Sequence, residues 1–463
     1  MDRFEAWFDG DDAFAPAATR ARPRIALPKP GSGLLRIGAI LSTVLLATSL
    51  IGGAHRVGLI STAGSVGATG ATPSPSVTAP TTSGDPSPTP SVTAPPQASV
   101  NGLLPISECK LGPTGSEWYF SAGFPISDTS DVLTTGPLRL AVIYVEFPDA
   151  PRRSSVAELH GAIEDHVEAI YAEMSYGKLA LDLISSRDWI MMDKSSTSYN
   201  VLQGEAEPEG VIRYVSEAIR KADSGIDFTG IDAVAVFATE LADGIAGDFQ
   251  LTLNDRITTD EGSGVFSTII TGGDWWEEEV DPMILAHEFG HVIGLQDLYE
   301  GGSSDLFEIA HQHVGNFDFM SRGWSDAFAP TILGWNRWRL GWIADSQVIC
   351  AKPEEGTEVL INALQAGSGP LLVVVPLSST RAVVVESRRP IGWDRSLPES
   401  GALVYLVDTS IDTTEGPIKI LADTFGDGFD SAPLSAGEYI DALSYTITSL
   451  EMATWGDRIY ITP

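Results

Sequence analysis

Basic residues are scarce in this chain of 463 residues, which has 28 lysines and arginines against 62 aspartates and glutamates. The resulting formal net charge is −34 at pH 7. Because a field of that sign repels nucleic acid and anionic lipid surfaces, we exclude both as electrostatic partners. Acidic side chains can bind calcium, yet the sequence lacks the twelve-residue loop that would identify a specific calcium site.

An uncharged apolar run lies near the N-terminus, from Ile37 to Ala54. The polar segment 1–33 before it contains several arginines and is interpreted as a cytoplasmic tail. Residues 34–54 are long enough to span a bilayer as a signal anchor, with the N-terminus inside. Small residues at 52–54 suit the alternative, a signal peptide that is removed. Both interpretations export the rest of the chain, either held at the cell membrane by the N-terminal helix or secreted.

The exported part begins with a tract, 55–100, that is rich in proline, serine and threonine and contains PSVTAP twice. Such a composition cannot bury a core, so we interpret it as a stalk.

Cysteine is also scarce, since only Cys109 and Cys350 occur. Both lie on the exported side, where disulfides persist, and we expect them to be bridged. Two buried free thiols are the alternative.

The segment 101–350 mixes the patterns of strands and helices. Strands are predicted at 138–147, 179–186 and 232–238, and amphipathic helices at 156–177 and 211–222. This mixture predicts an α/β domain with helices packed on a sheet. Residues 265–273 alternate like an edge strand, to which an extended peptide could add by backbone pairing. An ordinary strand inside the sheet is the alternative.

From 351 to 463 the sequence consists of short β-rich runs separated by glycine, proline, aspartate and serine. This pattern predicts an antiparallel β-sandwich without a catalytic constellation. Asp423, Asp427 and Asp430 are candidate calcium ligands, with a solvated acidic loop as the alternative.

The chemistry is concentrated in HEFGHVIGLQD, residues 287–297. Asp281 and Pro282 suit the start of a helix, on which His287 and His291 project from the same face and can bind one ion. Glu288 is rotated about 100 degrees from the first histidine, which places a base beside the metal. Gly294 allows a sharp turn after the helix, and this turn brings Asp297 back as a third ligand.

The alternative is a buried helix that contains these histidines by chance. A purely structural zinc is disfavoured, because such a site would normally have four protein ligands. The pattern HExxHxxGxxD resembles that of metzincin-like zinc endopeptidases, and within them the immune inhibitor A family of secreted bacterial metalloproteases. Further segments are similar to that family: VEFPD (145–149), EMSYGKLAL (173–181), NFDFMSRGW (316–324), GWNRWRLGWI (334–343) and 383–408.

This resemblance implies an α/β metzincin-like zinc peptidase domain, with a mixed sheet and an active-site helix, before the C-terminal antiparallel β-sandwich. It implies that His287, His291 and Asp297 bind Zn²⁺, that Glu288 is the general base, and that Met320 lies under the zinc. The sequence departs from the family at Gln296, where proline is common.

If Gln296 loosens the turn, Glu300 is a substitute for Asp297 as ligand. Tyr299 is a candidate oxyanion donor, and His311 and His313 are more readily explained as loop residues than as metal ligands. The expected function is an exported zinc-dependent endopeptidase that hydrolyses protein or peptide substrates. The alternative is a catalytically weak cell-surface binding or adhesion module on a peptidase fold.

Overall fold

The computed structural model describes residues 99–113, 121–126, 132–202, 208–262, 264–272, 282–300, 311–321, 330–422 and 429–463. All of them belong to one compact unit of the chain. The expected cytoplasmic tail, apolar segment and nearly all of the stalk lie outside these ranges. Among the helices that are described, none is long and apolar enough to cross a membrane.

A six-stranded sheet forms the centre of the first half of this unit, with strands in the order β2-β1-β5-β8-β7 and β3 beside β1. The strands are β1 (Gly136–Glu146), β2 (Leu179–Ser185), β3 (Ile190–Met191), β5 (Ala233–Ala238), β7 (Asp248–Thr258) and β8 (Gly264–Thr271). All neighbours pair in parallel except β7, which runs antiparallel to β8. The three predicted strands are confirmed. Of the two interpretations of 265–273, the ordinary sheet strand is confirmed and the edge strand is wrong, because β8 is paired on both sides and β7 lies at the edge.

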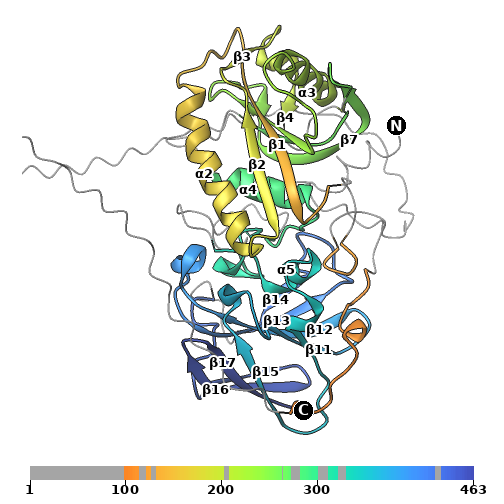
Figure 1. Ribbon diagram of the computed structural model, residues 1–463, viewed down its shortest axis with the longest axis vertical. Helices are drawn as coiled ribbons and strands as arrows, with labels where there is room; N and C mark the ends of the chain where they lie inside the picture. The colour runs from red at the N-terminus through yellow and green to blue at the C-terminus, as the bar shows by residue number, and fades with distance from the viewer. Residues whose placement is uncertain are drawn as a thin grey trace, which may run out of the picture. The chain divides into compact units, whose positions relative to one another are not determined.

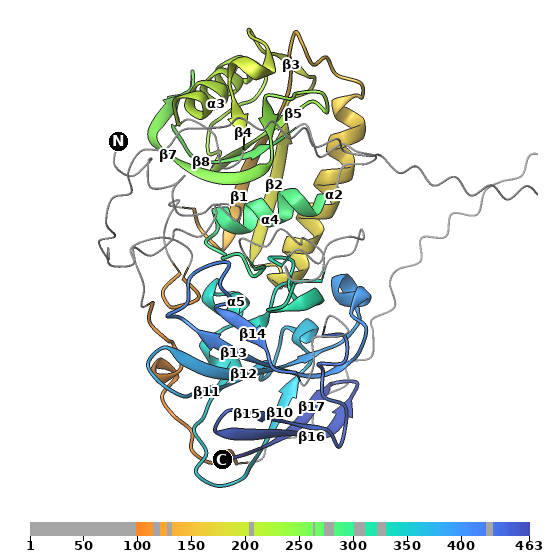
Figure 2. The same cartoon turned by 180° about the vertical axis from the view of Figure 1, so that it is seen from behind.

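Helices cover both faces of this sheet, as Figures 1 and 2 show. They are α2 (Val156–Met174), α3 (Pro208–Ala222) and α4 (Pro282–Val292), and the first two confirm the predicted amphipathic helices. Side chains of β1 alternate between two cores, as the pleat requires. Leu140, Val142 and Tyr144 pack in the core that contains α2 and α4, whereas Ala141 and Ile143 pack in the core that contains α3.

Short elements complete this half. They are a parallel pair, β4 (Val201–Leu202) with β6 (Ile245–Ala246), the helix α5 (Gly334–Arg339), and the 3-10 turns Ile106–Glu108, Ser196–Ser198, Gly315–Phe317 and Asp345–Gln347. α5 is entirely buried, which places a six-residue helix between the sheet of the first half and the strands that follow.

The C-terminal part contains two sheets that share one core. The five-stranded sheet has the order β14 (Ile418–Ile420), β13 (Gly401–Asp408), β12 (Arg381–Arg388), β11 (Leu372–Pro376), β9 (Val348–Cys350). The four-stranded sheet has the order β10 (Thr357–Asn362), β17 (Gly456–Thr462), β16 (Tyr445–Ala453), β15 (Tyr439–Ala442). Two 3-10 turns, Leu364–Ala366 and Gly392–Ser396, lie in the connections. All pairings are antiparallel except β9 with β11, and β9 precedes the expected boundary at 350.

The other face of the five-stranded sheet packs on the first half. Val374, Val384 and Tyr405 belong to the same core as Trp335 of α5 and Phe289 of α4. The five-stranded sheet therefore packs on one face against the elements that carry the histidine helix and on the other against the four-stranded sheet.

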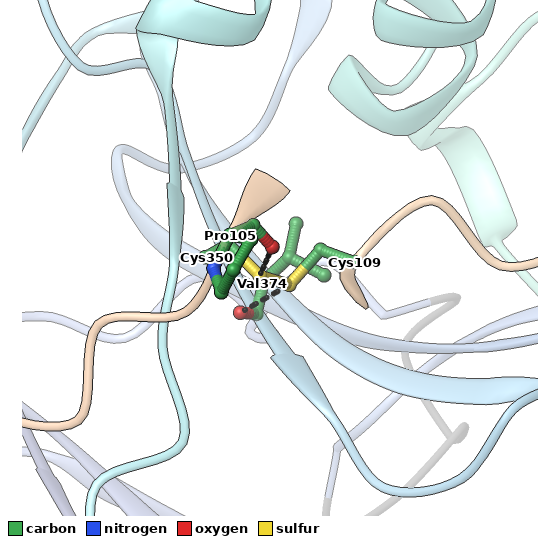
Figure 3. The surroundings of a disulfide bond; sticks show 4 residues. All are labelled: Pro105, Cys109, Cys350 and Val374. Carbon is green, nitrogen blue, oxygen red and sulfur yellow. Dashed lines mark hydrogen bonds between the residues drawn. A yellow bond between two sulfur atoms is a disulfide. The ribbon is translucent and has the colours of Figure 1, made fainter. Parts of the chain in front are cut away.

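Cys109 and Cys350 form a disulfide across 241 residues of sequence. Figure 3 shows it beside Val374 of β11 and Pro105 of the N-terminal segment. The alternative of two free thiols is wrong. The bond joins the segment that follows the expected stalk to the end of β9.

Candidate metal centre

The helix α4 is held in the core by contacts from α2. The Tyr171 hydroxyl donates a hydrogen bond of 2.6 Å to the Ala286 carbonyl, and its ring meets Phe289 edge-on at 5.0 Å between centroids. Pro282 is the first helical residue, as predicted, while Asp281 lies outside the described residues. Apart from Pro282, every residue of α4 is buried, so the two histidines face a site inside the protein.

Gly294 ends the helix in the way its sequence position predicts. Its φ is +91°, a region that residues with a side chain rarely adopt. The Leu295 N–H donates to the Gly290 carbonyl at 2.9 Å, which closes the helix end and reverses the chain. This reversal brings Asp297 back toward the histidines.

The structure brings His287, His291 and Asp297 together. Asp297 Oδ1 lies 3.0 Å from His287 Nε2 and 3.2 Å from His291 Nε2. One ligand atom from each residue lies within 4.8 Å of the other two, and among the described residues this is the group that could hold a metal ion. Four ligands at about 2.0–2.2 Å around tetrahedral zinc are about 3.3 Å apart, so the two measured separations fit this ion.

Both imidazoles are oriented from behind by backbone carbonyls. His287 Nδ1 lies 3.2 Å from the Phe319 oxygen, and His291 Nδ1 lies 2.9 Å from the Leu295 oxygen. A carbonyl can only accept, so each Nδ1 carries a hydrogen, and each Nε2 is directed at the site. Metal-binding histidines are commonly held by a second partner in this way.

The electrostatics of the three groups are strongly coupled. Burial lowers the pKa of His291, but Asp297 and Glu288 outweigh this effect and raise it to about 10. Burial raises the pKa of Asp297, but the two imidazoles outweigh it and hold this pKa well below its usual range. The site thus stabilises one positive charge next to Asp297, which either a proton or a cation can supply.

Glu288 lies beside the ligands and is also buried. Burial raises the pKa of its carboxyl, while both histidines and a hydrogen bond from the Gln250 backbone on β7 lower it. Within the described part of the chain its Oε2 atom is buried without a hydrogen-bond partner. One carboxylate oxygen is thus fixed by the edge strand, and the other can accept a proton.

Met320 packs under the histidine helix. A Cβ built on Gly290 would meet the Met320 sulfur at 2.7 Å, so only glycine leaves room for it between the two histidines. The Met320 carbonyl accepts the Leu298 N–H at 2.8 Å. Its turn therefore contacts the helix, the His287 imidazole through Phe319, and the segment that carries Asp297.

Asp318 holds this turn against the start of α5. Its carboxylate accepts the Met320 N–H at 2.9 Å and the Leu333 N–H at 2.8 Å, and burial raises its pKa to about 6. The next residue, Gly334, donates to Glu386 of β12 at 2.7 Å. A continuous set of buried hydrogen bonds thus connects the C-terminal sheet to the floor of the site.

Two side chains hold the turn at Asp297. Thr413 was not found from the sequence, and Gln296 was noted there only as a departure from the family. Thr413 Oγ1, in the loop between β13 and β14, accepts the Asp297 N–H at 3.0 Å. Gln296 is fully buried, and its Oε1 accepts a hydrogen bond of 2.7 Å from Arg339 of α5. The expectation that Gln296 loosens this turn is therefore wrong, because its amide tethers the turn to a buried helix.

The remaining candidates lie elsewhere. Glu300 pairs with His313 at 2.6 Å and accepts from Gln312, so it does not replace Asp297. His311 Nδ1 lies 3.1 Å from Ser321 Oγ. Tyr299 stacks on His287 with centroids 6.3 Å apart.

Of the three aspartates named as calcium candidates, Asp423 and Asp427 lie outside the described residues. No protein-family model matches this chain, and no curated protein matches it.

Proposed function

We propose that the chain is a zinc-dependent endopeptidase that hydrolyses peptide bonds in protein or peptide substrates. The observation that carries this proposal is the convergence of two imidazole Nε2 atoms on one oxygen of Asp297, next to an unpartnered oxygen of Glu288. A structural zinc would be closed by a fourth protein ligand, often cysteine, and both cysteines of this chain are in a disulfide.

His287, His291 and Asp297 would hold the zinc and leave one position open. When bound, zinc polarises a carbonyl oxygen and makes water a better nucleophile near neutral pH. Glu288 then takes the proton from the attacking water and returns it to the leaving amine. Its burial favours the first of these steps, because a carboxylate in an apolar site is more basic than one in water.

Export, and attachment through residues 34–54, belong to the same proposal and rest on the sequence. The α/β metzincin-like fold class of the first half is also part of the proposal. The parallel sheet with one antiparallel edge strand supports it. The disulfide supports the proposed export, because such bonds persist outside the cytoplasm.

Casein hydrolysis by the purified full-length chain tests the function. We expect activity that a chelator removes and added Zn²⁺ restores. Glu288→Gln should retain zinc and lose about 10²- to 10⁴-fold in rate, which is the range for a general base.

Glu217→Gln is the matched control, because Glu217 is also buried but lies on α3, on the other side of the sheet. Its rate should stay near that of the parent. Full activity of Glu288→Gln would refute the assignment, and zinc binding without any hydrolysis would favour the binding module.

A further inference from the structure

Arg339 is a buried cation next to the metal centre. Its side chain is almost fully buried, and its guanidinium donates to Gly123 O at 2.9 Å, Asn336 Oδ1 at 2.9 Å, Gln296 Oε1 at 2.7 Å and the Ser121 carbonyl. All of these acceptors are neutral. Among the described residues, no carboxylate forms an ion pair with it, and burial lowers its pKa to about 9.

A buried charge without a counterion is costly and is retained only where several hydrogen bonds compensate for it. Besides Asn336 on the same helix, the acceptors of Arg339 come from two segments that are far apart in sequence. One is the N-terminal segment at Ser121–Gly123, and the other is the turn at Gln296. The guanidinium therefore joins these two segments through its rigid fork of donors.

The N-terminal segment has its own attachment to α5. Trp335 Nε1 donates to the Ala122 carbonyl at 2.8 Å, and Phe124 meets the rings of Trp335 and Trp338 edge-on. The disulfide at Cys109 fixes the same segment further upstream. Ser121 and Gly123 are thus held in place independently of Arg339, and they offer it a rigid support.

Gln296 connects Arg339 to the metal ligand Asp297. Its Nε2 donates to Asn336 at 3.2 Å while its Oε1 accepts from Arg339, so the amide is bound on both sides. The next residue in the chain is Asp297, whose oxygen lies 3.0 Å from His287 Nε2. Movement of Gln296 would move this carboxylate away from the imidazoles.

We propose that Arg339 is a positioning residue of the metal centre: through Gln296 it fixes the turn that presents Asp297, and it makes that turn depend on the docked N-terminal segment. This inference rests on the proposed metal site but concerns residues that do not touch the ion. Removing either partner of the pair should weaken metal binding while the ligands themselves are unchanged.

The test measures zinc affinity of the full chain by competition with a chromogenic chelator. Arg339→Met and Gln296→Leu should each weaken zinc binding about tenfold, the lower end of the range for residues that orient ligands. The double variant should lose little more than either single one, because both changes break the same bridge. The visible absorption of the Co²⁺-loaded protein should change in both variants, since it reports the geometry of the ligands.

Arg337→Met is the matched control. Arg337 is on the same helix and equally buried, and it also donates to neutral oxygens, at Ile332 and Met174, but it does not contact the turn. Far-UV circular dichroism establishes folding, and Gln296→Leu decides the question if Arg339→Met does not fold. If folded Gln296→Leu has the zinc affinity and the Co²⁺ absorption of the parent, the inference about Arg339 is overturned while the metal site stands. If the parent does not bind zinc, the metal site is overturned as well.

Discussion

Replacing Gly290 by alanine should destabilise the protein, although glycine is a poor residue for a helix interior. Alanine at such a position usually stabilises a helix by about 0.5–1 kcal/mol. Here the new Cβ would lie 2.7 Å from the Met320 sulfur and 3.3 Å from Leu295 Cδ1. Met320 and Leu295 are both fully buried, so neither side chain can move into solvent.

The size of the effect follows from these contacts. Forcing an extra methyl group into a packed core costs about 1–3 kcal/mol, which exceeds the gain in helix propensity. We therefore expect Gly290→Ala to lower the free energy of unfolding by roughly 1–2 kcal/mol. In a Met320→Ala background only the milder contact with Leu295 Cδ1 at 3.3 Å remains, and the same change should raise the free energy of unfolding by up to about 0.5–1 kcal/mol.

Urea denaturation of the parent, the two single variants and the double variant, followed by circular dichroism, measures both free-energy changes. A chelator is present throughout, because bound metal would add its own stabilisation. The decisive result is the reversal of sign between the two backgrounds. If Gly290→Ala stabilises the parent protein, Met320 does not lie under the helix and the described floor of the site is incorrect.

Two further predictions concern Asp297 and its neighbours. Thr413→Val removes the acceptor of the part-buried Asp297 N–H, which costs about 1 kcal/mol, the lower end of the range for a buried donor, and it should weaken zinc binding in the chelator competition. Thr409→Val in the same loop should not, because Thr409 donates to Gly112 instead, and equal effects of the two changes would contradict the role of Thr413. The raised pKa of His291, about 10, means that its proton is bound at pH 7 and leaves when zinc enters. Calorimetry in buffers of different ionisation enthalpy should therefore show release of about one proton per zinc at pH 7 and less above pH 10; zinc uptake without proton release would contradict this protonation state.

Local patterns in the sequence predicted the histidine helix and its end. Spacing of four residues places two side chains on one face of any helix, and Gly294 has the positive φ that the reversal needs. The strand β1 was equally predictable, because a continuous apolar run is typical of a strand that is buried on both faces.

The residues that orient the ligands were not predictable in this way. Thr413 is 116 residues from Asp297, and the carbonyl of Phe319 is 32 residues from His287. Any residue can supply a backbone carbonyl as acceptor, so the residue type does not reveal it. A single threonine or arginine is also not part of a periodic pattern that would predict its partner. These contacts arise only when distant segments pack together.

Pairing of the sheet was also not predictable from the sequence. Residues 265–273 alternate, and alternation alone predicts a strand without saying which neighbours it has. The actual edge strand, β7, is more polar, and one of its backbone groups hydrogen-bonds to Glu288. The strand β9 also pairs with β11 across the expected limit at 350.

Zinc content, together with X-ray absorption at the zinc edge, tests the central claim most directly. The full-length protein, supplied with excess Zn²⁺ and desalted, should contain one zinc per chain with two imidazole nitrogens at about 2.0–2.1 Å and carboxylate oxygen at about 2.0–2.2 Å. Asp297→Ala should lose the carboxylate contribution and most of the affinity. A parent protein that retains no zinc, or holds it without imidazole ligands, would contradict the account.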